Sequence, residues 1–272
     1  MGRFWKLRNI TKSIFQPILI VLMLLLSSQE ISANIISDDI DPHELEVGDR
    51  IATMVEERWE RVNDPSKTAH LAMILERLKP YLNRPLPYEV RLINDPVQNA
   101  FSLPGGIIFL TSGMYDFIKS DSELAGIIAH ELIHSDRKHG MVQAARNQKL
   151  SLVAIAIVIA TQGQAAPAIL SSVAQTAISN SYSKDLEREA DLVGMDLLVR
   201  SGYEPSGMLT VIEALAEDEI KHPWVDPGIY MDHPYTDERI SYIIDGIREK
   251  GLPLRRKGSL NLLNISVINE EG

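Results

Sequence analysis

The sequence predicts an α+β fold that is mostly helical and contains one small β-sheet. Apolar residues recur at helical spacing over most of the chain, whereas the extended segments that can be placed lie within residues 88–110. With 272 residues, 45% of them hydrophobic, the chain is long enough to bury a substantial core. The length suits one large domain or two small ones.

Helical patterns lie on both sides of this sheet region. Residues 41–62 and 66–82 precede it, and helical spacing dominates from about residue 121 to residue 250. The expected extended segments are 88–93, 100–103 and 107–110. The last two are separated by the chain-breaking residues Pro104, Gly105 and Gly106.

Composition excludes several classes of protein. The formal net charge is -10, which argues against a nucleic-acid partner. The chain contains no cysteine, which excludes a disulfide scaffold, a thiolate-ligated metal site and a cysteine nucleophile.

Residues 1–33 are typical of a secretory signal peptide. Basic residues precede the apolar run 18–26, and the small residue Ala33 follows it. This run is short for a bilayer span, which needs about 20 residues. Such a signal would direct export of the chain to the periplasm, with cleavage near Ala33. The alternative is an uncleaved signal that anchors it in the inner membrane. The main domain would then cover residues 34–252, followed by a C-terminal tail, 253–272.

Residues 150–183 contain no charged side chain. A polar interruption at 161–164 and Pro167 divide the segment into parts that are too short to span a bilayer. The segment predicts either a buried apolar helical hairpin or a mobile apolar flap that covers a functional site or touches a membrane.

The chemistry is indicated by the motif His130-Glu131-Leu132-Ile133-His134, which has the pattern H-E-x-x-H. On a helix, the two histidines lie one turn apart on the same face and can bind one metal ion. Glu131 would take a proton from water instead of binding the metal.

The motif is predicted to lie on a buried helix over about residues 121–139. Ser120 and Glu123 form a capping-box pattern at its start, and Gly140 is well placed to end it. The helix is apolar nearly all round, so its polar side chains need partners, which a metal would provide.

A third metal ligand is expected downstream at Glu187. Glu187 and Asp191 share one face of a predicted amphipathic helix, and Gly194 on the same row would permit close helix packing. Glu187 could bind the metal while Asp191 accepts the free N–H of a ligand histidine. His139, five residues after His134, is expected to point elsewhere, as a polar or cationic group at the helix end. Two imidazoles and one carboxylate suit Zn²⁺ best, with one ion per subunit.

The two motifs together resemble the HtpX/BepA-like branch of the CAAX prenyl endopeptidase family of zinc metalloproteases, which are gluzincins. The similar stretches are H-E-L-I-H-S-D-R-K-H-G and L-E-R-E-A-D-L-V-G-M, within a resemblance that covers about residues 40–250. It implies that residues 34–252 form a gluzincin-type minimal metalloprotease domain. It also implies that Glu187 is the third zinc ligand and that Asp191 contacts the ligand residues without binding the metal itself.

Two more segments resemble this family. Residues 99–106 resemble the edge strand that flanks the active-site cleft, which implies that an exposed strand binds an extended peptide by main-chain pairing. Its residues are Ala100, Phe101, Ser102 and Leu103.

The second segment begins at His233-Pro234 and continues to Arg239-Ile240. In some resting forms of this family its histidine approaches the metal. His233 is therefore expected to be a displaceable fourth ligand or an oxyanion donor, with an ordinary turn residue as the alternative. Tyr230 and Tyr235 are weaker candidates for oxyanion donation.

The expected function is a zinc-dependent endopeptidase that hydrolyses misfolded or unassembled envelope proteins in protein quality control. Its partners would be unfolded polypeptides, with a possible contact at a membrane surface or with outer-membrane assembly. The main alternative is a chaperone-like protein that binds clients and has a structural or autoinhibited metal site. A prenyl-protein endopeptidase is a weaker alternative, because it needs a membrane-enclosed chamber.

Overall fold

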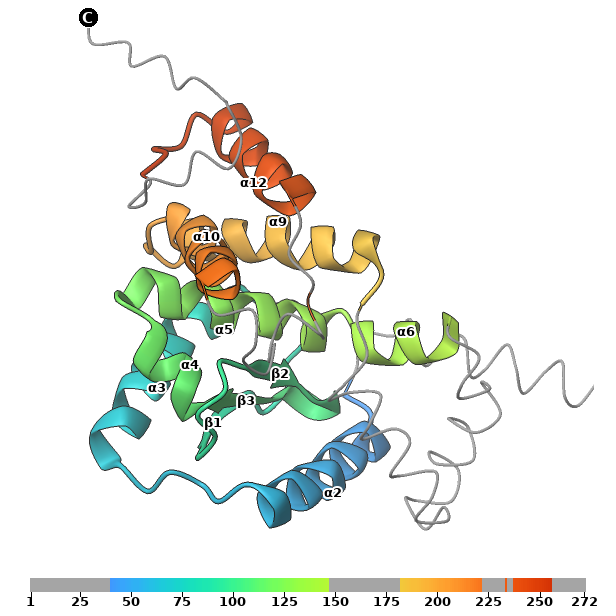
Figure 1. The fold of residues 1–272 in the computed structure, drawn as a ribbon. Coiled ribbons are helices and arrows are strands. Elements are labelled where there is room, and N and C mark those ends of the chain that lie inside the picture. Colours follow the sequence, from blue (N-terminus) through green and yellow to red (C-terminus); the bar gives the residue numbers. More distant parts are fainter. Residues whose placement is uncertain (1–39, 147–181, 222–232, 234–236, 256–272) are drawn as a thin grey trace, which may run out of the picture.

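The computed structural model describes residues 40–146, 182–221, 233 and 237–255 (Figure 1). The predicted signal peptide lies outside the described residues, as do nearly all of the uncharged segment 150–183 and most of the tail 253–272. The domain boundaries therefore stay predictions. Among the helices that are described, none has the length and apolar character needed to cross a membrane.

The described elements are mostly helices around one three-stranded sheet, which confirms the predicted fold class. In chain order they are α2 (Pro42–Arg58), α3 (Pro65–Leu78), the 3-10 helix η1 (Lys79–Tyr81), β1 (Glu89–Ile93), β2 (Ala100–Ser102), the 3-10 turn η2 (Pro104–Gly106), β3 (Ile107–Thr111), α4 (Ser112–Phe117), α5 (Asp121–Asp136), α6 (His139–Arg146), α9 (Lys184–Arg200), α10 (Ser206–Lys221) and α12 (Asp237–Glu249).

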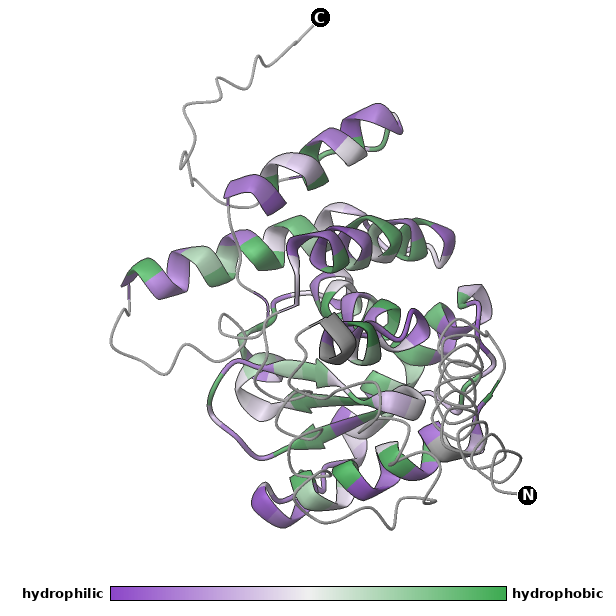
Figure 2. Cartoon of the chain, turned by 90° about the vertical axis from the view of Figure 1, so that its right-hand side faces the viewer, coloured by the Kyte–Doolittle hydropathy of each residue, from purple (hydrophilic) through white to green (hydrophobic). Residues whose placement is uncertain are grey.

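The sheet has the strand order β1-β3-β2, with β1 parallel and β2 antiparallel to β3. Alternate residues of β3 enter two separate cores, since Phe109 packs with α2 and Ile108 packs on the side of α5. α2 thus covers one face of the sheet and α5 the other, and α9, α10 and α12 continue the layers beyond α5 (Figure 1). The strands are mostly hydrophobic, whereas α12 alternates between hydrophilic and hydrophobic residues (Figure 2).

Helix α5 is the central layer and is buried along almost its whole length. Its start is capped as predicted, because the Ser120 side chain accepts a hydrogen bond from the backbone N–H of Glu123. Glycines allow the neighbouring helices to approach it closely. A Cβ on Gly207 would lie 2.3 Å from the carbonyl oxygen of Ser122, and one on Gly126 of α5 would lie 3.0 Å from the Met208 backbone. A Cβ on Gly194 would meet the α5 backbone at 3.5 Å, an ordinary contact distance.

The predicted C-terminus of this helix is wrong. α5 ends at Asp136 instead of residue 139, and Gly140 lies inside the next helix, α6. The chain turns at Lys138, which adopts a left-handed conformation with φ 55°. Tertiary contacts stabilise this turn, because the Asp136 carboxylate accepts hydrogen bonds from the backbone N–H of Arg84 and from the Tyr88 hydroxyl. The buried Lys138 ammonium lies 3.8 Å from Glu44.

The first two predicted helices are also shorter than expected. Instead of continuing to residue 62, α2 ends at Arg58, because the following chain joins the sheet edge: Arg61 forms a bridge with Ile93, and the Val62 N–H bonds to Leu92. α3 ends at Leu78 and continues as the 3-10 turn η1, which contains Pro80.

Candidate metal centre

The packing of α5 on α9 brings the two sequence motifs into one buried cluster. His130 and His134 come from α5, and Glu187 comes from the first turn of α9. His233 joins them from the chain shortly before α12. One potential ligand atom from each of these four buried side chains lies within 4.8 Å of all the others.

The distances between these atoms fit one tetrahedral cation. Nε2 of His130 lies 3.0 Å from Nε2 of His134 and 3.2 Å from Nδ1 of His233. The carboxylate oxygens of Glu187 lie 3.6 Å from His130, 3.4 Å from His134 and 2.8 Å from His233. Tetrahedral ligands bound at about 2.0–2.1 Å are about 3.3 Å apart, so the four donors suit a zinc-sized ion.

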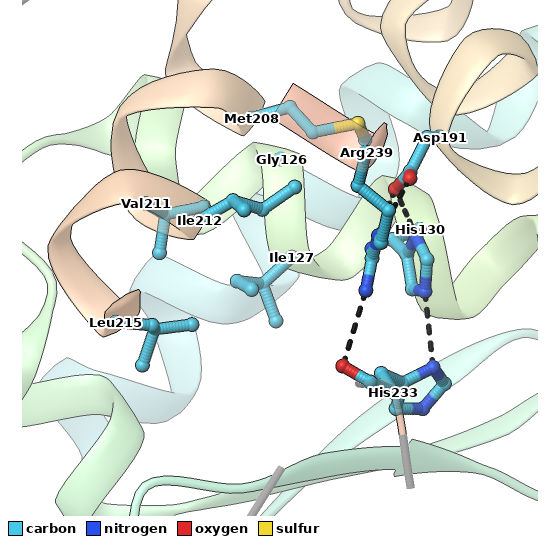
Figure 3. A pocket seen from close by; sticks show the side chains of 10 residues that line it. All are labelled: Gly126, Ile127, His130, Asp191, Met208, Val211, Ile212, Leu215, His233 and Arg239. Atoms are coloured by element: carbon cyan, nitrogen blue, oxygen red, sulfur yellow. Dashed lines mark hydrogen bonds and ion pairs between the residues drawn. The ribbon is translucent and has the colours of Figure 1, made fainter. Parts of the chain in front are cut away.

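Asp191 lies behind His130, where the sequence predicts it. Its Oδ1 is 2.9 Å from Nδ1 of His130 (Figure 3). Arg239 contacts both oxygens of this carboxylate, at 2.7 and 2.8 Å, and Tyr242 donates a hydrogen bond of 2.5 Å. Burial opposes ionisation, but the Arg239 guanidinium and the contact with His130 hold the pKa of Asp191 well below its usual range. A permanent carboxylate therefore orients the His130 ring.

Glu131 lies beside the cluster without belonging to it. Its two carboxylate oxygens are buried. The closest charged contact is to Nε2 of His233, at 3.4 Å from Oε1. Burial raises the pKa of Glu131, which favours proton uptake. A buried carboxylate in this position is suited to take a proton from water.

Glu187 is held as a carboxylate. Burial works against its ionisation, but His233 and Arg239 keep its pKa well below the ordinary value. One of its oxygens lies 3.0 Å from the Arg239 guanidinium. Burial also lowers the pKa of His134, which favours the neutral imidazole that a metal binds.

His233 offers a fourth potential ligand atom to the same cluster. Its Nδ1 faces the ligand atoms, its Nε2 faces Glu131, and its carbonyl oxygen accepts a hydrogen bond from Arg239. Burial lowers the pKa of His233, but the carboxylates of Glu187 and Glu131 outweigh it and raise that pKa to about 9. The weaker candidates Tyr230 and Tyr235 lie outside the described residues.

The expectation that His139 points away from the site is wrong. Its Nδ1 lies 3.0 Å from Nδ1 of His134, and the residue is buried. The reason is the early end of α5, because the turn at Lys138 directs His139 back toward the site as the first residue of α6. Burial lowers the pKa of His139 to about 4, so the side chain is neutral and not a cation at a helix end.

Tyr182 also belongs to the surroundings of the site, and sequence analysis misses it. Its ring stacks on the His134 imidazole, with ring centroids 3.9 Å apart and planes at 21°. The residue lies just before α9, at the end of the uncharged segment 150–183, and the apolar character of that segment does not single out this tyrosine.

The predicted substrate strand is at the edge of the sheet but is not exposed. β2 is the terminal strand of the order, which confirms its predicted place. Ala100, Phe101, Ser102 and Leu103 are all buried, so the expected exposure is wrong. Phe101 stacks on Phe109 in the core beneath α2, and the Leu103 carbonyl accepts a hydrogen bond from Ser135 of α5.

A small apolar pocket adjoins the cluster on the side of α10 (Figure 3). Its volume of about 30 Å³ is enough for one water molecule. Ile127, Val211 and Leu215 line its apolar part, and His130 and His233 lie at its polar end. The metal cluster is thus bordered by an apolar wall on this side.

Two histidines of one helix, a carboxylate of a second helix and a buried glutamate beside them define a metallopeptidase centre. The chain belongs to peptidase family M48, whose sequence model matches residues 65–245. This confirms the resemblance noted in the motifs.

Named relatives agree with this assignment. The chain is 28% identical over 208 residues to the beta-barrel assembly-enhancing protease of Escherichia coli K12, in a match that covers 73% of this chain and 42% of that protein. It is 31% identical to the metalloprotease YcaL of the same organism, over 65% of this chain and 68% of YcaL. It is 30% identical to the mitochondrial metalloendopeptidase OMA1 of Arabidopsis thaliana, over 48% of this chain and 26% of that protein. The chain thus spans less than half of the first of these relatives.

Glu187→Ala should lose stoichiometric zinc, because only the histidines would remain to bind it. Metal content after dialysis, measured by mass spectrometry, checks this. Asp196→Ala is the matched control, since Asp196 lies on the same helix, α9, and its exposed carboxylate pairs with Lys250. Equal zinc content in both variants would exclude Glu187 as a ligand.

Proposed function

We propose that this protein is a zinc-dependent endopeptidase that cleaves misfolded or unassembled envelope proteins. The observation that carries the proposal is the tetrahedral arrangement of His130, His134, Glu187 and His233, with the buried carboxylate of Glu131 beside it. The family membership supports peptide hydrolysis, and zinc is the divalent ion that two or three imidazoles and a carboxylate suit best.

His130, His134 and Glu187 would hold the zinc ion. When bound, zinc would lower the pKa of a water molecule from about 15.7 toward about 7 and polarise the scissile carbonyl. Glu131 takes the proton of the attacking water and later delivers it to the departing amine nitrogen. Asp191 and Arg239 keep the His130 ring in its binding orientation.

His233 would close the site in the resting protein. A catalytic zinc site keeps one position for water or substrate, whereas a structural site is filled by protein ligands. With His233 at the fourth vertex the arrangement is closed. Displacement of this ring would open the position that catalysis needs. The closed arrangement also keeps the second candidate function open, a client-binding protein whose metal site is autoinhibited or structural.

Unfolded polypeptide is the substrate class that we favour. β2 is the terminal strand of the sheet and contacts α5, so an extended peptide paired with it would lie beside the cluster. Main-chain pairing tolerates many sequences but needs an unfolded segment. Because the strand is buried, this pairing requires that its edge first be uncovered. The relatives named beta-barrel assembly-enhancing proteases support an envelope substrate and a role near outer-membrane assembly.

We also propose that the chain acts in the periplasm. The basic, apolar and small-residue pattern of residues 1–33 supports export and cleavage near Ala33. N-terminal sequencing of the protein recovered from the periplasmic fraction should begin close to Asn34. Recovery of the full-length chain in the inner-membrane fraction would favour the uncleaved anchor instead.

Glu131→Gln should reduce cleavage of an unfolded polypeptide such as casein by about 10²–10⁴-fold, the usual contribution of a general base. Its zinc content should stay at the wild-type level, since Glu131 is not one of the ligands. Cleavage is followed on gels with purified, zinc-loaded protein, and a stably folded protein serves as the uncut control. Undiminished cleavage by this variant would refute the proposed mechanism, and full complementation in cells would favour the client-binding function.

His233→Ala should raise cleavage of casein several-fold while zinc is retained, because the substitution opens the fourth position. If His233 instead donates to the oxyanion, cleavage should fall by about 10²–10³-fold at unchanged zinc content. Parallel measurements of zinc content and initial cleavage rate separate these roles. Loss of zinc together with activity would instead identify His233 as a structural ligand.

A further inference from the structure

The ligand histidine His134 has a contact on each of its ring nitrogens. Nε2 faces the ligand cluster, and Nδ1 lies 3.0 Å from Nδ1 of His139. The other nitrogen of His139, Nε2, lies 3.5 Å from a carboxylate oxygen of Glu189. A line of side chains therefore runs from the metal site through His139 to a carboxylate at the surface, since Glu189 is 44% exposed.

We propose that His139 is a positioning residue that fixes the tautomer and the ring orientation of His134 for metal binding, and that Glu189 orients His139 in turn. The inference rests on the proposed function in one respect, namely that the cluster binds zinc. It assigns to His139 and Glu189 a role toward the metal that the ligand motif itself does not contain.

One set of tautomers suits both contacts, although the outer one, at 3.5 Å, is longer than a hydrogen bond. A neutral His134 that binds metal through Nε2 carries its proton on Nδ1 and donates it to Nδ1 of His139. His139 must then carry its own proton on Nε2, which faces the Glu189 carboxylate. The opposite tautomer of His134 would place a proton where the metal binds. His139 and Glu189 thus disfavour the form that cannot bind.

The two ligand histidines of α5 are therefore supported from behind in different ways. His130 contacts the buried Asp191, which Arg239 and Tyr242 hold in place. His134 contacts a neutral imidazole whose carboxylate partner also lies 3.6 Å from Arg137. Stacking of Tyr182 on the His134 ring restrains the plane of the ring but not its tautomer. Among the described residues, His139 is the one histidine whose ring nitrogen contacts Nδ1 of His134, and this contact bears on the tautomer.

The experiment compares zinc affinity in the purified full chain and in four variants, by competition with a chromophoric chelator. His139→Ala removes the acceptor, whereas His139→Asn places an amide oxygen near the position of Nδ1. Glu189→Gln weakens the outer contact at a partly exposed site. His70→Ala is the matched control, because His70 is a partly buried histidine that bonds to the Tyr115 hydroxyl, away from the cluster. The absorption spectrum of the Co²⁺-loaded proteins reports ligand geometry independently of activity.

His139→Ala should bind zinc about 10–100-fold more weakly than wild type, the usual effect of losing a partner behind a metal ligand, and its Co²⁺ spectrum should change. His139→Asn should recover most of the affinity, Glu189→Gln should lose a few-fold, and His70→Ala should match wild type. Wild-type affinity and spectrum in His139→Ala would overturn the inference, as would equal losses in the alanine and asparagine variants.

Two controls keep the interpretation definite. Circular dichroism and thermal unfolding of the metal-free proteins show whether each variant folds. If His139→Ala does not fold, the zinc affinity of Glu189→Gln tests the inference instead. Unchanged affinity in that variant would contradict the proposed role of the His139–Glu189 contact. A wild-type chain that binds no zinc would refute the proposed function itself, which is a different outcome from equal binding by wild type and variants.

Discussion

The structure depends on the close packing of α9 against α5, because this contact buries five ionisable groups together. The contact places Glu187 and Asp191 beside His130 and His134, with Glu131 in the same region. Burying a carboxylate costs several kcal/mol unless opposite charge and hydrogen bonds compensate. Arg239 compensates Asp191 and contacts Glu187, but the ring nitrogens of His130 and His134 then face one another across 3.0 Å. One cation bound between them would serve both nitrogens.

The sequence predicts correctly those features of the site that depend on local helical spacing. The H-E-x-x-H spacing lies on one helix, and the relation of Glu187 to Asp191 lies on another, so helical geometry alone places each pair on one face. That these two faces meet is not local information. The expectation came from the need of buried polar groups for partners and from the family resemblance, and the structure brings the faces together.

The errors arise where tertiary contacts override a local signal. Gly140 is a reasonable helix stop, yet the chain turns at Lys138, where burial next to Glu44 outweighs the cost of a left-handed backbone. That shift of a few residues changes the direction of His139 and hides its contact with His134 from any argument based on spacing. The prediction that β2 is exposed is wrong for a similar reason. A short strand pattern indicates an edge strand but does not show which elements pack on it.

The position of Glu131 supports the proposal that His233 closes the site in a resting protein, in preference to a structural zinc site. A structural site needs four donors and gains nothing from an additional buried carboxyl group beside them. Such a group costs stability, and functional sites are where a protein tolerates that cost. His130, His134 and Glu187 lie within helices that pack on each other, whereas His233 lies outside the described helices, before the start of α12. It is the donor that can leave without disrupting a helix, and its departure would expose Glu131 to the vacated position.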